Sequence, residues 1–160
     1  FRIKDHGPYP VVFDMKRLSG MNPYYRTALW TGNCLQVTLM SIPAGGDIGL
    51  EMHSDTDQLI YIESGCALVK MGPKKDNLDY RKKVVENCAI LVPACTWHNI
   101  INTGRTPLKL FSVYAPPHHP FGTVHKTKQD VEMQESYWAL SRARGRMVYF
   151  EMNIFARVFH

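Results

Sequence analysis

The sequence predicts an all-β domain, built as an antiparallel sandwich or barrel. From about residue 34 onward, short runs rich in β-branched and aromatic residues alternate with breaks. The breaks are rich in glycine, proline, asparagine, aspartate and serine, which favour turns and interrupt strands. Several short strands at this spacing are typical of sandwiches and barrels.

Seven runs between residues 34 and 115 are expected to form strands. Each is bounded by turn residues, such as the stretch from Pro43 to Gly46, the pair Ser64-Gly65 and the loop 72–80. The expected strands are residues 34–42, 58–63, 66–71, 81–86, 88–92, 98–102 and 107–115.

The C-terminal part of the chain differs from the strand-rich region in its residue pattern. Asp130 is expected to cap a short C-terminal helix over residues 131–145, which has acidic residues early and arginines late, as the helix dipole favours. The last stretch, 147–160, is apolar and needs a covering surface, either the barrel or a second subunit. We therefore expect an N-terminal segment that packs on the barrel (1–33), the barrel itself (34–128), and a C-terminal helix and tail (129–160).

Size and charge are those of an ordinary globular domain. The chain has 160 residues, of which 45% are hydrophobic and 21% charged, and its net charge is +5. The segment from Lys70 to Glu86 holds six cations and three anions, so it supplies +3 of that charge. Because this segment matches no DNA- or RNA-binding motif, we expect a solvated surface and no nucleic-acid partner.

Cysteine spacing and hydropathy suggest a cytoplasmic protein. The four cysteines form no CxxC pair, which excludes zinc-ribbon and thioredoxin-type sites, and they are too sparse for a disulfide scaffold. No apolar run approaches the roughly 20 residues of a membrane span, and the N-terminal stretch lacks the apolar core of a signal peptide. We expect reduced thiols and no membrane partner.

Four polar side chains form a candidate metal site. Glu51 and His53 are two apart on an expected strand, so both point to the same face, while Gln58 opens the next strand and His98 comes from a later one. Imidazole and oxygen ligands suit Mn, Fe, Ni or Zn, and the lack of a thiolate disfavours structural zinc. Asp55 and Asp57 are alternative carboxylates, although turn residues usually cap their own backbone.

The spacing of these residues resembles that of the cupin family, whose first motif is G-x5-H-x-H-x3-4-E-x6-G. Here Glu51-x-His53-x4-Gln58-x6-Gly65 keeps that spacing, and the opening glycine falls at Gly45. Glu51 replaces the first histidine of the motif, and Gln58 replaces its glutamate.

The second cupin motif, G-x5-P-x-G-x2-H-x3-N, is also matched in spacing. The corresponding positions are Asn87, Pro93, Cys95, His98 and Asn102, so both glycines of the motif are replaced. The strong resemblance covers residues 34–115, and residues 26–128 look more loosely like small bacterial cupins often likened to mannose-6-phosphate isomerase.

The resemblance implies a double-stranded β-helix, the jelly-roll barrel, with a divalent metal ion in its mouth. The implied ligands are Glu51, His53, Gln58 and His98, with a formal charge of −1 in total, the same as the common set of three histidines and one glutamate. One imidazole fewer and one oxygen more shift the preference toward Mn or Fe.

Several functions fit the family resemblance. The leading expectation is an isomerase-like enzyme that acts on a small polar or phosphorylated substrate, and the alternatives are an iron-dependent dioxygenase and a non-enzymatic small-molecule binding protein. Tyr114 and His125 are candidate substrate-binding residues, whereas His118 and His119 lie among prolines and are expected to form a loop. No GxSxG, P-loop, GxGxxG or HExxH pattern is present.

Assembly as a homodimer is also expected. An open jelly roll has exposed edge strands, which small cupins often pair across a two-fold axis. The apolar ends of this chain would otherwise remain uncovered.

Overall fold

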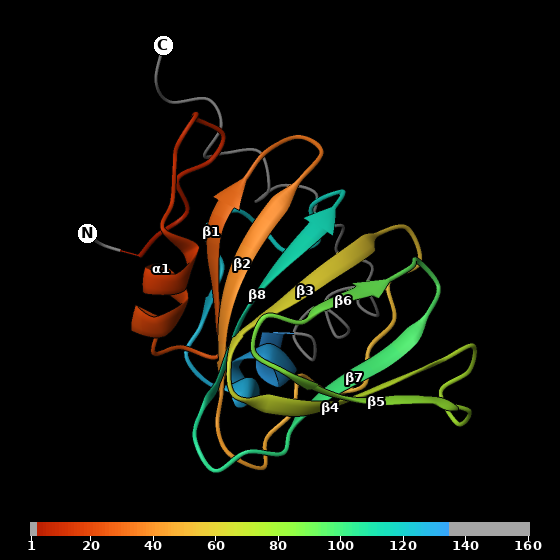
Figure 1. Cartoon of the computed structure of the whole chain (residues 1–160). Helices are drawn as coiled ribbons and strands as arrows, with labels where there is room; N and C mark the ends of the chain where they lie inside the picture. The colour runs from red at the N-terminus through yellow and green to blue at the C-terminus, as the bar shows by residue number, and fades with distance from the viewer. Residues whose placement is uncertain (1–2, 135–160) are drawn as a thin grey trace. The chain divides into compact units, whose positions relative to one another are not determined.

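The computed structural model describes residues 3–134 (Figure 1). The chain divides into two compact units, the first ending at Lys126 and the second beginning at Thr127. The first unit contains the strands described below, together with one helix. It is mostly β-structure, as the sequence predicts.

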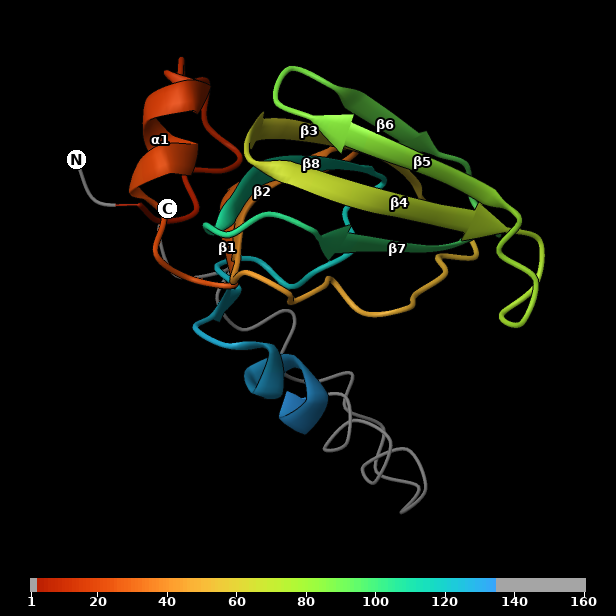
Figure 2. The same cartoon turned by 60° about the horizontal axis from the view of Figure 1, so that its bottom comes forward.

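Two antiparallel sheets form the first unit. The larger sheet has the order β6-β3-β8-β2-β1-β9 and the smaller has the order β5-β4-β7. Figures 1 and 2 show the two sheets as facing layers, the arrangement of a jelly-roll barrel. The strands are β1 (Arg26–Thr31), β2 (Gln36–Ile42), β3 (Asp57–Ser64), β4 (Cys66–Gly72), β5 (Tyr80–Val85), β6 (Ala89–Val92), β7 (Trp97–Asn102), β8 (Leu108–Ala115) and β9 (Val124–His125).

The long connection between β2 and β3, residues 43–56, runs beside β7 and extends the smaller sheet. Isolated bridges join Asp47 to Ile101 and Glu51 to His98. The prediction that Glu51 and His53 lie on a regular strand was therefore wrong. A turn closed by Gly46 N–H donating to Pro43 O at 2.9 Å, and the left-handed backbone of Gly45 and Gly49, interrupt the ladder in this segment.

The core fills the space between the sheets. Strand β8 alternates, with Leu108, Leu110, Ser112 and Tyr114 buried and the residues between them more exposed. Such alternation puts every second side chain on the inner face. The innermost aliphatic residues, fully buried, each stabilise the fold by about 1.5–3 kcal/mol. They include Ile42, Ile60, Ile62, Ile100, Leu108 and Leu110.

Helix α1 (Met15–Met21) contacts β2, β3 and β8 and covers one end of the outer face of the larger sheet (Figure 1). Its Leu18 packs with Leu29 and Leu39 in a buried cluster. The helix begins after Asp14, whose carboxylate accepts from Arg17 N–H at 3.0 Å as an N-cap. This cap fixes where the helix starts above the sheet.

All seven predicted strands are present as β2 to β8, with bounds that differ by at most two residues from the prediction. The sequence reading did not identify α1, β1 or β9. Residues 1–30 mix turn signals with apolar residues, and this pattern predicts a segment that packs on the barrel rather than a strand of it. Its register with β2 makes it a member of the larger sheet.

In the second unit, residues 128–134 are helical. The Asp130 carboxylate accepts from Thr127 N–H at 2.9 Å. Asp130 is thus the third residue of the helix, and its carboxylate caps the N–H of Thr127, the residue just before the helix. The prediction that Asp130 itself precedes the helix as its N-cap was therefore wrong. The remainder of the predicted helix and the apolar stretch 147–160 lie outside the described residues.

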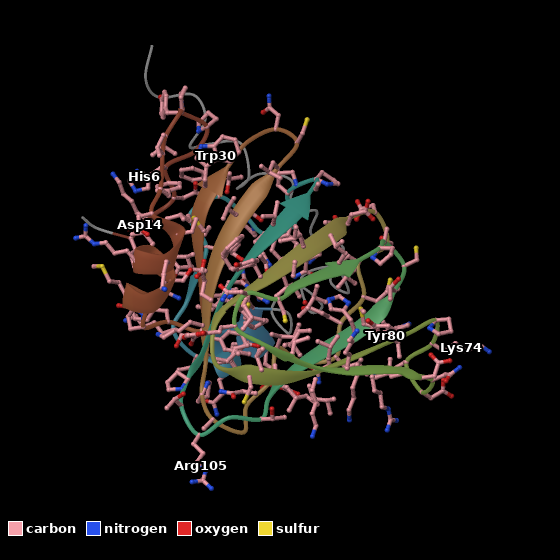
Figure 3. The ribbon with its side chains drawn as sticks, viewed as in Figure 1. His6, Asp14, Trp30, Lys74, Tyr80 and Arg105 are labelled. Atoms are coloured by element: carbon pink, nitrogen blue, oxygen red, sulfur yellow. The ribbon has the colours of Figure 1, made fainter. Side chains whose placement is uncertain are left out.

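The basic residues of the β4–β5 and β7–β8 connections lie on the surface. Lys74 projects from the β4–β5 connection and Arg105 from the β7–β8 connection, and both are exposed (Figure 3). This agrees with the solvated surface expected for the basic segment. Across residues 3–134, no helix combines the length and the apolar character that crossing a membrane requires.

Candidate metal centre

Three ligand-type side chains converge between the sheets. Glu51 Oε1 lies 3.5 Å from His53 Nε2 and 3.4 Å from His98 Nε2. One ligand atom from each of the three residues lies within 4.8 Å of the others. We call Glu51, His53 and His98 the triad. Both histidines are buried, and the Glu51 side chain is 24% exposed, although its Oε1 atom is itself buried.

Backbone pairing places two members of the triad. Glu51 N–H donates to His98 O at 3.0 Å, and His98 N–H donates to Glu51 O at 2.9 Å. Residues paired in this way sit directly opposite each other and point to the same face. His53 is held separately, since its carbonyl accepts from Cys95 N–H at 2.6 Å. The two motif segments, far apart in sequence, are therefore joined at the site.

Two turns of the second motif keep the conformation that glycine would adopt. Asn87 and Cys95, which replace the two glycines of the second cupin motif, have φ of 66° and 62°. Asparagine tolerates this left-handed region, whereas cysteine adopts it at a cost. The turn at Cys95 is also tied to β3, because Asp57 accepts from Ala94 N–H at 2.8 Å. Substitution of the glycines thus leaves the backbone of the motif intact.

Gln58, the fourth predicted ligand, lies against the triad. Its Oε1 is 3.1 Å from His98 Nε2, and its Nε2 donates to Ser112 Oγ at 3.4 Å. Gln58 is buried on β3, opposite Tyr114 on β8. Its amide oxygen therefore faces the same point as the triad.

The hydrogen bonds of His98 are compatible with a metal ion at this point. His98 Nδ1 lies 2.9 Å from Thr96 O, a carbonyl that can only accept, so Nδ1 carries the hydrogen. In a neutral ring, Nε2 then presents a lone pair to the oxygens of Gln58 and Glu51. These atoms attract one another only if a proton or a metal ion lies between them. A carbonyl bonded to the far nitrogen is also the usual way of orienting a metal-binding histidine.

The protonation of Glu51 fits a ligand role. Burial alone would raise its pKa, but the adjacent imidazoles of His53 and His98, together with the charge of Arg26, outweigh burial and hold the pKa below its ordinary value. The contacts with the imidazoles are too long or bent for regular hydrogen bonds, so within residues 3–134 Glu51 Oε1 and His53 Nε2 are buried without such a partner. Two imidazole nitrogens and carboxylate and amide oxygens fit Mn, Fe, Ni or Zn.

The alternative carboxylates do not join the triad. Asp57 caps the turn at Ala94, and Asp55 accepts from Thr56 Oγ1 at 3.3 Å. Both side chains are exposed. Asn102 of the second motif is likewise structural, because its amide donates to the carbonyls of Ile42, Pro43 and Thr106.

The two predicted substrate-binding residues both lie inside the barrel. Tyr114 is fully buried, with its ring centroid 5.8 Å from that of His53. Burial raises the pKa of its hydroxyl, and the charge of Arg26 partly counters this. His125 is buried on β9, directly opposite Arg26 on β1. Tyr114 thus lies beside the triad, and His125 lies beside Arg26.

Sequence reasoning missed three residues near the site. The rings of His118 and His53 are 4.0 Å apart between centroids, and those of His119 and Tyr114 are 5.0 Å apart. The segment forms the expected loop, and its two imidazoles lie against the site. Arg26, which influences the pKa of Glu51, was missed as well. The pair His118-His119, two prolines after the strand of Tyr114, is a usable signal in the sequence, whereas no local pattern marks Arg26.

Comparison with known proteins assigns the family. Residues 38–114 match the model of the cupin domain. The chain is 56% identical over 133 residues to the uncharacterized protein YrkC of Bacillus subtilis, covering 83% of this chain and 72% of that protein. The chain belongs to the cupin family. The resemblance seen in the two motifs is thereby confirmed.

Solved structures agree with this assignment. The crystal structure of BH2720 from Bacillus halodurans matches this cupin with a TM-score of 0.81 and 53% identity, covering 82% of this chain and 99% of that one. The structure of TT1209 from Thermus thermophilus matches with a TM-score of 0.56 and 22% identity, over 66% of this chain and 96% of that one. The second likeness concerns the fold alone.

Proposed function

We propose that this cupin is an enzyme that binds one divalent metal ion through Glu51, His53, Gln58 and His98 and acts on a small polar or phosphorylated molecule. The observation that carries the proposal is the convergence of the triad and the Gln58 oxygen on one point, with two of these atoms buried and otherwise unpartnered. A bound divalent ion would polarise an oxygen of the substrate as a Lewis acid. The isomerase-like reaction rests on the family resemblance.

A dioxygenase is the second candidate, and the composition of the triad favours it. Two histidines and one carboxylate form the ligand set that non-haem iron oxygenases use, with positions left open for substrate and oxygen. Under this alternative the native metal is iron, and Gln58 orients a ligand rather than binding the metal. Oxygen uptake by the iron-loaded protein with candidate substrates would separate the two.

A non-enzymatic binding protein is the third candidate. The cupin fold hosts many activities, so the barrel alone does not specify catalysis. Tight binding of a small molecule without turnover, in protein loaded with its native metal, would favour this alternative.

The decisive experiment begins with elemental analysis of protein purified without added metal, which we expect to show about one transition-metal ion per chain. Calorimetric titration of the demetallated protein with Mn²⁺ then tests the ligands. Glu51→Ala should lose at least tenfold in affinity, because it removes the only anionic ligand from a partly desolvated site. Asp55→Ala is the matched control and should bind normally. Loss of binding in Asp55→Ala but not in Glu51→Ala would overturn the assignment.

We also propose that the protein works in the cytoplasm. All four cysteines, Cys34, Cys66, Cys88 and Cys95, are free thiols. Free thiols persist in reducing compartments, where glutathione and thioredoxin keep them reduced.

A further inference from the structure

Arg26 is a buried cation without an anionic partner among the described residues. The residue opens β1 and is 2% exposed, and its Nε–H has no hydrogen-bond partner there. Within residues 3–134, no carboxylate oxygen lies within ion-pair distance of its guanidinium. The guanidinium carbon lies 5.7 Å from the centroid of the Tyr25 ring. A charge buried in this way is strongly unfavourable unless something pairs with it.

Arg26 lies beside the proposed metal centre. Its charge lowers the pKa of Glu51, of Tyr114 and of His119, side chains that surround the triad. Glu51, the one triad residue that carries a negative charge, already contacts His53 and His98 at 3.5 and 3.4 Å. Among the described residues, Arg26 therefore forms no ion pair, because the carboxylate of Glu51 contacts the two imidazoles instead.

Two further donors lie near Arg26. Tyr114 Oη and Thr38 Oγ1 are buried, and within residues 3–134 neither makes a hydrogen bond of regular geometry. Thr38, on β2, pairs with Ser112, two residues before Tyr114 on β8, and Arg26 lies on β1, the next strand of the same sheet. The charge of Arg26 and the hydroxyl of Thr38 both lower the pKa of Tyr114, in agreement with this strand arrangement. Three neighbouring strands thus bring a guanidinium and two hydroxyls to one place.

Such a set of donors is suited to an oxyanion. A guanidinium binds carboxylate or phosphate oxygens through parallel N–H donors, and hydroxyls complete the shell. The exposed cations of the β4–β5 connection, such as Lys74, are solvated and need no such partner (Figure 3). Arg26, in contrast, is shielded from water and requires an anionic partner.

We propose that Arg26, with Tyr114 and Thr38, binds the carboxylate or phosphate group of the small molecule that occupies this site. The inference rests on the proposed function insofar as the rest of that molecule would lie at the metal centre. It narrows the substrate class to small anions. A neutral molecule would leave the buried guanidinium unpaired and should therefore bind poorly.

Calorimetric titration of the Mn²⁺-loaded full-length protein tests this, with three probes: malonate, inorganic phosphate and the neutral isostere malonamide. We expect at least one anion to bind tenfold or more tighter than malonamide, and malonate and phosphate distinguish the two anion types. Arg26→Met should lose at least tenfold in affinity for the preferred anion, and Arg26→Lys should keep part of it. Lys74→Met, which removes an exposed cation, is the matched control and should bind like the parent.

Metal affinity separates this proposal from the preceding one. Arg26→Met should bind Mn²⁺ at least as tightly as the parent, because a nearby positive charge has been removed. If the parent binds no Mn²⁺ but still binds anions through Arg26, the metal proposal fails and the anion site stands. If neither anion binds the parent, or if both bind Arg26→Met unchanged, the anion site is wrong. Tyr114→Phe supplies a second variant should Arg26→Met fail to fold, and unchanged anion affinity in it would also contradict the proposal.

Discussion

Cys95 keeps the backbone next to the triad in a conformation that glycine adopts more easily. Its φ is 62°, and its N–H donates to the carbonyl of His53. A residue with a side chain pays roughly 1–2 kcal/mol in this region. Glycine avoids that cost but loses about 0.5–1 kcal/mol through the greater entropy of its unfolded chain.

We therefore expect Cys95→Gly to raise the free energy of unfolding by about 0.5 kcal/mol, which is the difference between those two effects. Urea denaturation measures this through a higher midpoint at an unchanged slope. Asn87→Gly is the matched control and should gain less, because asparagine already tolerates the left-handed region. A clear loss of stability in Cys95→Gly would mean that the bond from its Sγ to Ser54 O at 3.3 Å matters more than the backbone does.

Gln58 carries the second prediction about a single residue. Gln58→Glu restores the common residue of the family and changes the formal charge of the ligand set from −1 to −2. We expect the demetallated variant to bind Mn²⁺ at least as tightly as the parent in a calorimetric titration. Ser112→Ala is the control, since it removes the acceptor of the Gln58 amide without changing charge. If Gln58→Glu abolishes binding, Gln58 acts as a hydrogen-bond donor and is not a direct ligand.

At the scale of elements, one buried side chain anchors the loop over the site. Gln36 Oε1 accepts from the N–H groups of His118 and His119 at 3.2 and 2.9 Å, and its Nε2 donates to His119 O at 2.8 Å. Gln36 is fully buried at the start of β2. The loop is thus attached to the sheet by three hydrogen bonds from a single amide.

Gln36→Leu should release this loop. We expect a loss of about 1–3 kcal/mol in the free energy of unfolding, because buried backbone groups lose their partners. Hydrogen exchange at the amides of His118 and His119 should become faster, while exchange in β4 should change only in proportion to global stability. Gln129→Leu, at an exposed position, is the control for the same substitution. Unchanged exchange at both histidines would show that other contacts hold the loop.

The same loop should loosen in acid. Burial, assisted by the charge of Arg26, lowers the pKa of His119 to about 2. In the unfolded chain, His119 takes up a proton near the ordinary histidine pKa of about 6.5. The contribution of neutral His119 to the free energy of unfolding is therefore complete above about pH 6.5 and decreases as the pH falls toward 2. Loop exchange, corrected for the intrinsic pH dependence of exchange, should therefore increase between pH 6.5 and 4. His119→Asn should reduce this increase, and an unchanged pH profile in that variant would contradict the prediction.

The sequence predicts the strands and ligands that are marked by nearby residues. Turn residues bound β2 to β8 clearly, and the spacing of His53, Gln58 and His98 along the chain is enough to bring them together once the strands pair. Arg26 and Gln36 act through contacts with residues more than eighty positions away or on other strands, such as the bond from Gln36 to His119. No local pattern encodes such pairings. The Glu51 segment deviates from a strand because glycines interrupt it, although the bridge to His98 still aims its side chain correctly.

At the scale of the whole molecule, the outer face of the larger sheet is only partly covered. Helix α1 packs over Leu39, with Val37 and Phe111 at its margin. Farther along the sheet, Val113, Leu59 and Leu91 stand side by side on β8, β3 and β6. The first two are half-buried, and Leu91 is 69% exposed. Figure 1 shows β6 at the opposite end of the sheet from α1.

The edges of the smaller sheet are less suited to self-association. Strand β5 is an edge strand and carries Arg81, Lys82 and Lys83, all exposed. Consecutive charges on an edge strand discourage pairing with another chain, since like charges would meet across the junction. The apolar row at β6 is therefore the better surface for a second copy of this chain.

Homodimer formation is accordingly predicted to use this row. Sedimentation velocity at micromolar concentration should show a dimer, because pairing two copies through a two-fold axis removes Leu91 and its neighbours from water on both sides. Leu91→Glu should shift the protein to monomer by placing two carboxylates against each other in the contact. Leu35→Glu, at another exposed leucine in the β1–β2 connection, is the matched control and should remain dimeric. A parent protein that sediments only as a monomer would refute the dimer, and a dimer that survives Leu91→Glu would place the contact on a different surface.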